Sequence, residues 1–127
     1  MEQKKVWFVT GASKGLGLSL VQKLLLEGYC VVATSRNVDV LQKKAGVASK
    51  LFLPIQVDLT DSNDVKNAIA QSVAHFGKID VVVNNAGYGQ TGALEELSHK
   101  EVQDNFEVNV FAPLHVIRHA IPFLRTQ

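Results

Sequence analysis

A glycine-rich turn between two regular segments constrains the fold of this chain more than any other feature. It reads Thr10-Gly11-Ala12-Ser13-Lys14-Gly15-Leu16-Gly17 and directly follows the apolar run 6–9. Leucines then recur at positions 16, 20 and 24, with Val21 and Leu25 beside them, which is the spacing of an apolar helix face. A short apolar strand that ends at glycine and passes into a helix is typical of parallel α/β folds.

The same alternation continues along the chain. Strands are expected at residues 31–34, 51–57 and 79–83, and Pro54 favours a sheet edge or an irregular start for the second of these. Helices are expected after Asn37, over 61–76, and from the capping box 98–101 onward, with a kink at Pro113. The last helix carries an apolar stripe of Val102, Phe106, Val110, Leu114, Ile117, Ile121 and Leu124. This order predicts a doubly wound, three-layer α/β fold with strand order 3-2-1-4.

The three glycines of the turn suit a phosphate ligand. Gly11 permits a tight turn, Gly15 lets backbone approach a phosphate, and Gly17 lets the helix pack close to the sheet. The helix start then offers free N–H groups and a positive dipole end to a diphosphate. The spacing Gly-x-x-x-Gly-x-Gly differs from Gly-x-Gly-x-x-Gly, and no Gly-Lys-Ser/Thr of a nucleoside triphosphate loop occurs. A structural turn without a ligand is the alternative.

Three further motifs follow the turn along the chain, in this order: Asp58-Leu59-Thr60, Asn84-Asn85-Ala86-Gly87 and Asn109. Together the four motifs resemble those of the short-chain dehydrogenase/reductase family, and the resemblance covers essentially the whole chain. It implies a Rossmann-like fold, a nicotinamide dinucleotide cofactor and an oxidoreductase of which this chain is the N-terminal, cofactor-binding half.

The resemblance also implies site residues. Asp58 would contact the adenine ring, Asn84 would brace the sheet, and Asn109, the one candidate catalytic residue, would organise a proton-relay water. The alternatives are a helix cap for Asp58, a plain turn for 84–87, and a structural amide bonded to nearby backbone for Asn109. The implied cofactor-binding residues are Thr10, Gly11, Ser13, Lys14, Gly15, Leu16, Gly17, Ser35, Arg36, Asp58, Leu59, Asn85, Ala86 and Gly87.

Charge indicates which dinucleotide is preferred. An acidic residue about 20 positions after the turn would bind the ribose 2′-hydroxyl of NAD. Here the segment 33–37 contains no acid, whereas Arg36 lies in it and Lys14 lies inside the turn. Two cations can neutralise a 2′-phosphate, so the sequence favours NADP(H) over NAD(H). The alternative is that both are ordinary solvated charges.

The family's Tyr-x-x-x-Lys pair does not occur in these 127 residues, because Ala33 follows Tyr29 and Gly92 follows Tyr88 at the lysine position. We therefore expect residues 1–127 to be an NAD(P)-binding Rossmann half-domain, truncated before the catalytic segment and inactive by itself. The complete protein is expected to transfer hydride between NADP(H) and a small carbonyl or alcohol substrate, and to form homo-oligomers. A non-catalytic NADP(H)-binding module and a structural fragment are the alternatives.

Charge, apolar runs and the numbers of cysteines and histidines limit the partners, the compartment and the metal sites that we expect. A net charge of +1 with scattered lysines and arginines argues against nucleic acid as a partner, and no apolar run approaches the length of a membrane span. The single cysteine, Cys30, and the short apolar run after residues 1–5 predict a cytoplasmic protein without a signal peptide. His115 and His119 lie one helical turn apart but lack a third ligand, so a surface pair is expected rather than a metal site.

Overall fold

The computed structural model describes residues 4–46 and 49–127, so the expectation about a signal peptide rests partly on residues outside the described ones. Ten elements follow one another along the described chain. They are β1 (Val6–Val9), α1 (Gly15–Leu26), β2 (Cys30–Ser35), α2 (Val38–Ala45), β3 (Phe52–Gln56), α3 (Ser62–Phe76), β4 (Val81–Val83), α4 (His99–Phe106), the π-helical turn η1 (Glu107–Phe111) and α5 (Ala112–Arg125).

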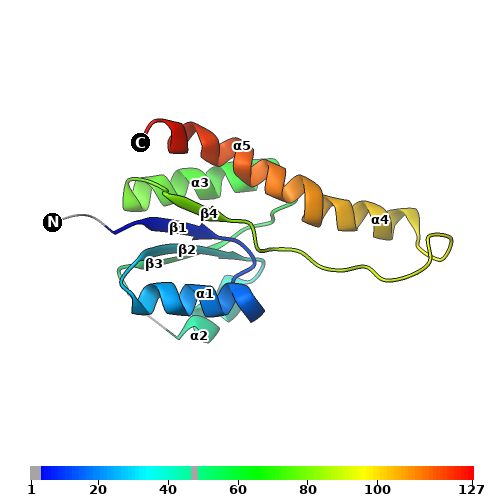
Figure 1. Ribbon diagram of the computed structural model, residues 1–127, viewed down its shortest axis with the longest axis horizontal. Coiled ribbons are helices and arrows are strands. Elements are labelled where there is room, and N and C mark those ends of the chain that lie inside the picture. Colours follow the sequence, from blue (N-terminus) through cyan, green and yellow to red (C-terminus); the bar gives the residue numbers. More distant parts are fainter. Residues whose placement is uncertain (1–3, 47–48) are drawn as a thin grey trace.

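The four strands form one parallel sheet in the order β3-β2-β1-β4, which confirms the predicted 3-2-1-4 order. Pro54 lies in the edge strand β3, where its missing N–H breaks no ladder on the open side. Helices α1 and α2 cover one face of the sheet, and α3 and α5 cover the other (Figure 1). The result is the predicted three-layer α/β arrangement.

Strand side chains alternate between the two helical layers, as the pleat requires. Phe8 and Val32 belong to the core that includes Ile69 of α3 and Val116 of α5. The neighbouring strand residues Val9, Val31 and Ala33 pack instead with Val21 and Leu24 of α1 and with Leu41 and Ala45 of α2. Both faces of the central strands are therefore buried, which explains why these strands read as continuous apolar runs.

Local signals set the starts of three helices. The side chain of Asn37 accepts hydrogen bonds at the start of α2, and Asp61 does the same for α3. Ser98 and Glu101 form the predicted capping box of α4. By contrast, Lys14 precedes α1 without any side-chain cap, and the first turn of α1 contains no acidic residue.

Two predicted apolar faces are corrected by the structure. Leu16 is 83% exposed, since it lies in the first turn of α1 at the end of the layer where the strands stop (Figure 1). The predicted stripe of the last helix is wrong in its middle part, although Leu124 at its end packs against the core and Val102 and Ile121 are half-buried. Its buried positions are Ala112, Val116 and Ala120, whereas Phe106, Val110, Leu114 and Ile117 are between 41% and 50% exposed.

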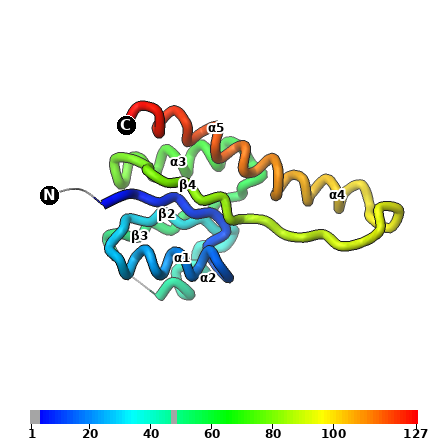
Figure 2. Tube along the Cα trace, in the orientation of Figure 1, coloured from blue at the N-terminus to red at the C-terminus, as the bar shows by residue number. Residues whose placement is uncertain are grey.

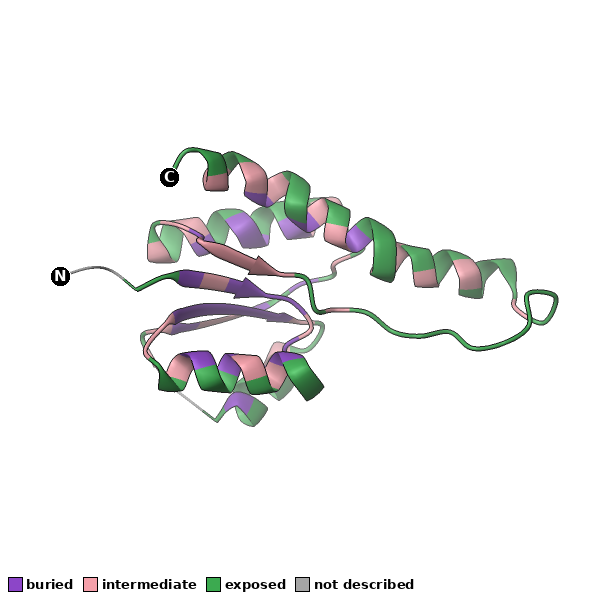
Figure 3. Ribbon diagram, viewed as in Figure 1, coloured by how far each residue is buried: buried purple, intermediate pink, exposed green. Residues whose placement is uncertain are grey.

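The segment 84–98 and helix α4 project from the body of the molecule as an arm (Figures 1 and 2). Most of this arm is exposed to solvent, as its green colouring in Figure 3 indicates. The irregularity predicted at Pro113 takes the form of the π-turn η1 immediately before it, while Pro113 itself lies in the first turn of α5. The backbone stays helical from η1 into α5, and the N–H of Ala112 donates to the carbonyl of Glu107, five residues back. The wider π-turn thus directly precedes the proline, which has no N–H to donate.

No helix within residues 4–46 and 49–127 combines the length and the apolar character needed to cross a lipid bilayer.

Candidate functional site

The glycine-rich turn is tied to the strands on both sides of β1. The backbone N–H of Thr10 donates to the carbonyl of Val83 at the end of β4, over 3.1 Å. The N–H of Ala12 donates to the carbonyl of Thr34 near the end of β2, also over 3.1 Å. The turn therefore lies across the carboxyl ends of three strands, which is where ligands bind in open α/β sheets.

The hydroxyl of Thr10 holds the segment that follows β4. Thr10 is buried, and its Oγ1 accepts hydrogen bonds from the backbone N–H groups of Asn85 and Ala86, each over 3.1 Å. The same oxygen lies 3.5 Å from the carbonyl of Val83. One side chain thus joins the glycine-rich turn to the Asn-Asn-Ala-Gly segment.

Two glycines make this close approach possible. Gly11 has a φ of 63°, and a Cβ there would lie only 2.8 Å from the Cα of Ala86. A Cβ on Gly17 would overlap the carbonyl oxygen of Gly11 and lie 2.6 Å from the Nδ2 of Asn85. Gly17 therefore makes room for the turn and for Asn85, rather than for the approach of helix to sheet that we expected.

The bracing asparagine is Asn85, not Asn84. The Nδ2 of Asn85 donates to the carbonyl of Gly11 over 3.0 Å, so it links the end of β4 to the turn. Asn84 is exposed, and among the described residues its side chain has no hydrogen-bond partner. The sequence alone does not distinguish adjacent asparagines, since their order on a turn depends on which side chain points back to β1.

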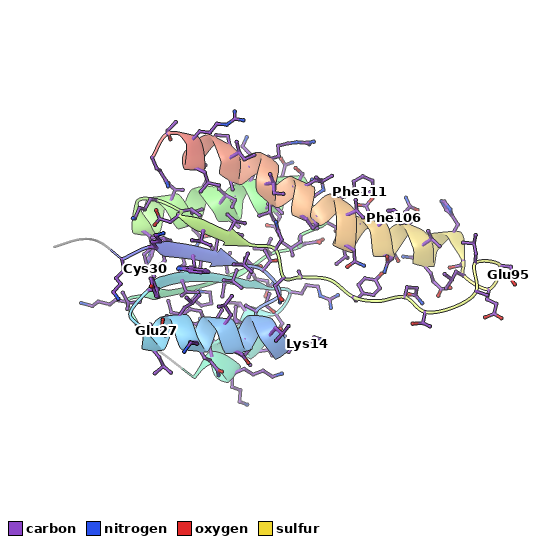
Figure 4. The ribbon with its side chains drawn as sticks, in the orientation of Figure 1. Lys14, Glu27, Cys30, Glu95, Phe106 and Phe111 are labelled. Atoms are coloured by element: carbon purple, nitrogen blue, oxygen red, sulfur yellow. The ribbon has the colours of Figure 1, made fainter. Side chains whose placement is uncertain are left out.

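Gly15 lies at the open start of α1. It has a φ of 58°, and apart from its chain neighbours and the backbone of its own helix no atom lies within 4 Å of the position that a Cβ would occupy. Lys14 is exposed beside it, and Figure 4 shows Lys14 at this end of α1. The first N–H groups of the helix have no side-chain cap, so the positive end of the helix dipole faces open space. This surface suits an anion.

Three further predicted residues lie at the ends of β2 and β3. The Oγ of Ser35 accepts the N–H of Asn37 over 3.1 Å, which leaves its hydroxyl hydrogen free to donate. Asp58 accepts hydrogen bonds from the Oγ1 and the N–H of Thr60, over 2.6 Å and 3.0 Å. These bonds, and the nearby charge of Arg36, hold the pKa of Asp58 below its usual value.

The alternative role of Asp58 as a helix cap is excluded, because Asp61 caps α3. Leu59 is half-buried against the core of the α3–α5 layer, and Ser13 is half-buried in the turn. The predicted site residues in the glycine-rich turn, at the end of β2 and after β3 thus lie along the carboxyl edge of the sheet.

Asn109 lies in η1 and is bound to the backbone of Tyr88. Its Oδ1 accepts the N–H of Tyr88 over 2.9 Å, and its Nδ2 donates to the carbonyl of Tyr88 over 2.6 Å. A Cβ on Gly87 would lie 2.7 Å from this Oδ1. Asn109 is exposed, and this pair of bonds satisfies its side-chain amide. The structural alternative is therefore observed, and a catalytic role stays a prediction.

Sequence reasoning missed Asn105, whose Nδ2 also donates to the carbonyl of Tyr88, over 3.1 Å. Its position four residues before Asn109 would have indicated a shared helix face. His119 also differs from the expected surface pair with His115. The Nε2 of His119 lies 3.0 Å from the Oγ of Ser62, so it forms a contact between α5 and α3 instead of a surface pair.

Burial is the main cause of a lowered pKa at His119, and the charges of Lys66, Arg118 and His115 act in the same direction. Within residues 4–46 and 49–127, no group of three or more His, Cys, Asp or Glu side chains is placed to hold a metal ion. Cys30 is buried, and this burial raises the pKa of its thiol, against the opposing charge of Lys78.

A parallel sheet whose carboxyl edge carries a glycine-rich turn at an uncapped helix start defines a Rossmann-type α/β unit. The profile described as short chain dehydrogenase matches residues 5–127, and the chain belongs to that family. This result confirms the family resemblance seen in the sequence motifs.

Individual relatives agree with this assignment. Oxidoreductase BOA17 of Botryotinia fuckeliana is 37% identical over 97% of this chain and 45% of its own length. A short-chain dehydrogenase from Streptomyces avermitilis superposes with a TM-score of 0.93 at 36% identity, over 99% of this chain and 46% of that one. The 3-ketoacyl-(acyl-carrier-protein) reductase of Brucella melitensis, solved in complex with NADH, has a TM-score of 0.91 at 29% identity, over 98% and 52%. The chain thus spans about half the length of these relatives.

Proposed function

We propose that this chain binds NADP(H) along the carboxyl edge of its sheet. In this proposal the first turn of α1 holds the diphosphate, Lys14 and Arg36 hold the 2′-phosphate, and Asp58 contacts the adenine. Asn85, Ala86 and Gly87 lie beside the nicotinamide ribose. The chain is then the NAD(P)-binding half-domain, residues 1–127, of an oxidoreductase.

The observation that carries the proposal is the open start of α1. Three other helices begin with a capping side chain, whereas α1 leaves its first N–H groups uncapped next to a glycine with free space around it. An uncapped helix start of this kind is completed by a bound anion such as a diphosphate. The NADH complex of the Brucella melitensis reductase supports a nicotinamide dinucleotide as that ligand.

The preference for NADP(H) rests on charge at the end of β2. Arg36 is exposed there and lies close enough to Asp58 to lower the pKa of that carboxyl. The segment 33–37 contains no acidic residue, so the end of β2 itself offers no carboxylate that would repel a 2′-phosphate or select a free 2′-hydroxyl. A planar guanidinium gives such a phosphate a bidentate partner.

For the complete protein we propose hydride transfer between NADP(H) and a small carbonyl or alcohol substrate. The chain's own contribution is to bind and orient the dinucleotide, and Asn109 would contribute to the active site. Since the 127 residues contain no Tyr-x-x-x-Lys pair, we expect no turnover from this chain alone. That same observation favours a second candidate, an NADP(H)-binding module without catalysis.

Calorimetric titration of the 127-residue chain with NADPH and with NADH tests the proposal. We expect a tighter dissociation constant for NADPH than for NADH. Circular dichroism on the same sample establishes that the chain is folded. A folded chain that binds neither dinucleotide would overturn the proposed function, and equal binding of both would overturn the NADP preference.

A further inference from the structure

Three polar side chains on one stripe of α4 and η1 bind the segment that follows β4. Glu101, Asn105 and Asn109 are spaced four residues apart, which keeps their side chains on one side of the helix. Figure 2 shows the segment running beside α4 along the arm. The Oε2 of Glu101 accepts the side-chain amide of Gln90 over 3.3 Å, and both asparagines bind the backbone of Tyr88.

The carbonyl oxygen of Tyr88 accepts two side-chain donors. The Nδ2 of Asn109 lies 2.6 Å from it and the Nδ2 of Asn105 lies 3.1 Å from it. A carbonyl oxygen has two lone pairs, so both are occupied. Asn109 also binds the N–H of Tyr88, whereas Asn105 binds only the carbonyl. With donors on two turns of one helix, the peptide that follows Tyr88 is restrained in both position and plane.

This restraint extends to Gly87. A Cβ there would lie 2.7 Å from the Oδ1 of Asn109, so the backbone of Gly87 passes directly against the helix. On its other side, Ala86 is held by the hydroxyl of Thr10 over 3.1 Å. The short segment 86–88 is thus fixed between the glycine-rich turn and η1, and Asn105 supplies one of the bonds at its far end.

We propose that Asn105 is a positioning residue that, together with Asn109, fixes the Tyr88 peptide and so the course of Ala86 and Gly87. Its functional consequence rests on the proposed function, because Ala86 and Gly87 are the residues we assign to the nicotinamide ribose. The geometric part does not depend on a cofactor and is testable without one.

Hydrogen–deuterium exchange on the 127-residue chain tests the geometric part. Asn105→Asp keeps the size of the side chain but replaces the donor with a carboxylate that repels the Tyr88 carbonyl. Asn105→Leu removes the donor without adding charge. The Tyr88 N–H keeps its bond to Asn109, but opening of the segment then breaks one hydrogen bond fewer. We therefore expect the Tyr88 amide to exchange about fivefold faster in both variants. Gln103→Leu, at an exposed position on the same helix, is the control and should leave the exchange unchanged.

Ligand binding tests the functional part. We expect Asn105→Asp to weaken NADP⁺ binding about three- to tenfold, the scale of one lost hydrogen bond. Adenosine 2′,5′-bisphosphate, which carries only the adenosine end, should bind as in the wild type. A merely structural loss of stability would weaken both ligands alike, and that result would overturn the positioning role.

The remaining outcomes are also decisive. If the wild type binds no dinucleotide, the proposed function fails, while the exchange data still judge the restraint of Tyr88. The proposed restraint would be overturned if the exchange rate of the Tyr88 amide were unchanged in both Asn105 variants. It would also be overturned if Gln103→Leu accelerated that exchange equally. If the variants do not fold, a through-bond NMR coupling between the Asn105 side-chain nitrogen and the Tyr88 carbonyl carbon of the wild type decides, and its absence counts against the proposal.

Discussion

The hydroxyl oxygen of Thr10 lies 3.1 Å from the backbone nitrogen of Ala86 and accepts its hydrogen bond. This contact joins the glycine-rich turn to the end of β4 across 76 positions of sequence. Because Thr10 is buried, its side chain is held in place, and the two motifs that we assign to the diphosphate and to the nicotinamide ribose are kept in one geometry.

Thr10→Val should therefore destabilise the fold. The substitution keeps the shape of the side chain but leaves the Ala86 N–H without its acceptor, which costs about 1–3 kcal/mol. We expect a melting temperature lower by about 4–15 °C. Thr10→Ser retains the hydroxyl and should recover most of the loss. Equal melting temperatures for Thr10→Val and the wild type would contradict the role assigned to this bond.

Two neighbouring glycines should respond differently to alanine. Gly17→Ala places a methyl group against the Gly11 carbonyl and 2.6 Å from the Asn85 amide, so we expect a loss of about 2 kcal/mol or more of stability. Gly15→Ala meets no atom but adopts a φ of 58°, which costs about 1 kcal/mol. Only Gly15→Ala projects into the space assigned to the diphosphate, so it should weaken NADPH binding more than it lowers stability. Chemical denaturation and calorimetric titration separate the two effects.

Arg36→Ala should discriminate between the two dinucleotides. Loss of a charge-assisted contact to the 2′-phosphate is expected to raise the dissociation constant for NADPH about 10- to 100-fold. The constant for NADH should change by less than about twofold, since NADH has no such phosphate. Lys43→Ala removes an exposed charge from α2 and is the control for long-range electrostatics. Equal losses for NADPH and NADH would refute the assignment of Arg36.

His119 should make stability depend on pH. Burial lowers the pKa of His119 below the ordinary 6.5, with Lys66, Arg118 and His115 adding to the effect. Between the folded and the unfolded pKa, the unfolded chain binds a proton at His119 that the folded chain does not. The stability that neutral His119 contributes is therefore complete above pH 6.5 and is lost as the pH falls toward the folded pKa. We expect the melting temperature to fall between about pH 7.5 and pH 5.5, by about 2 °C more in the wild type than in His119→Gln. Gln retains a donor for Ser62, and an identical pH profile for the two proteins would exclude this role.

The exposed apolar side chains of α4, η1 and the start of α5 should promote self-association. Phe106, Val110, Leu114 and Ile117 are each more than 40% exposed, Phe111 is 44% exposed, and Figure 4 shows Phe106 and Phe111 on the same stretch of helix. In addition, β4 has an unpaired edge in the described sheet, which is a template for strand pairing. We expect light scattering to detect oligomers at about 50 μM that are reduced in Phe111→Glu.

Leu26→Glu is the matched control for that experiment, because Leu26 is 88% exposed on α1, far from the arm in sequence, and a scattered exposed leucine is ordinary. It should leave the association unchanged. A monodisperse wild-type monomer with high thermal stability would contradict the prediction.

The sequence by itself determined the elements and their order. The caps at Asn37 and Ser98, the sheet edge that Pro54 favours and the glycine-rich turn all follow from contacts within a few residues or from allowed backbone angles. Right-handed crossovers then leave few ways to order four parallel strands. These signals are local, so they can be read from spacing alone.

Only the tertiary structure decided which side chains meet across the sheet edge. Contacts between segments far apart in sequence decide that Asn85 rather than Asn84 reaches Gly11, and that Gly17 makes room for the Asn85 amide. Such contacts also decide that Asn105 and Asn109 share one carbonyl. The exposure of Leu16 has the same origin. Periodicity gives the angle of a side chain around its helix, whereas burial depends on whether another element covers that position.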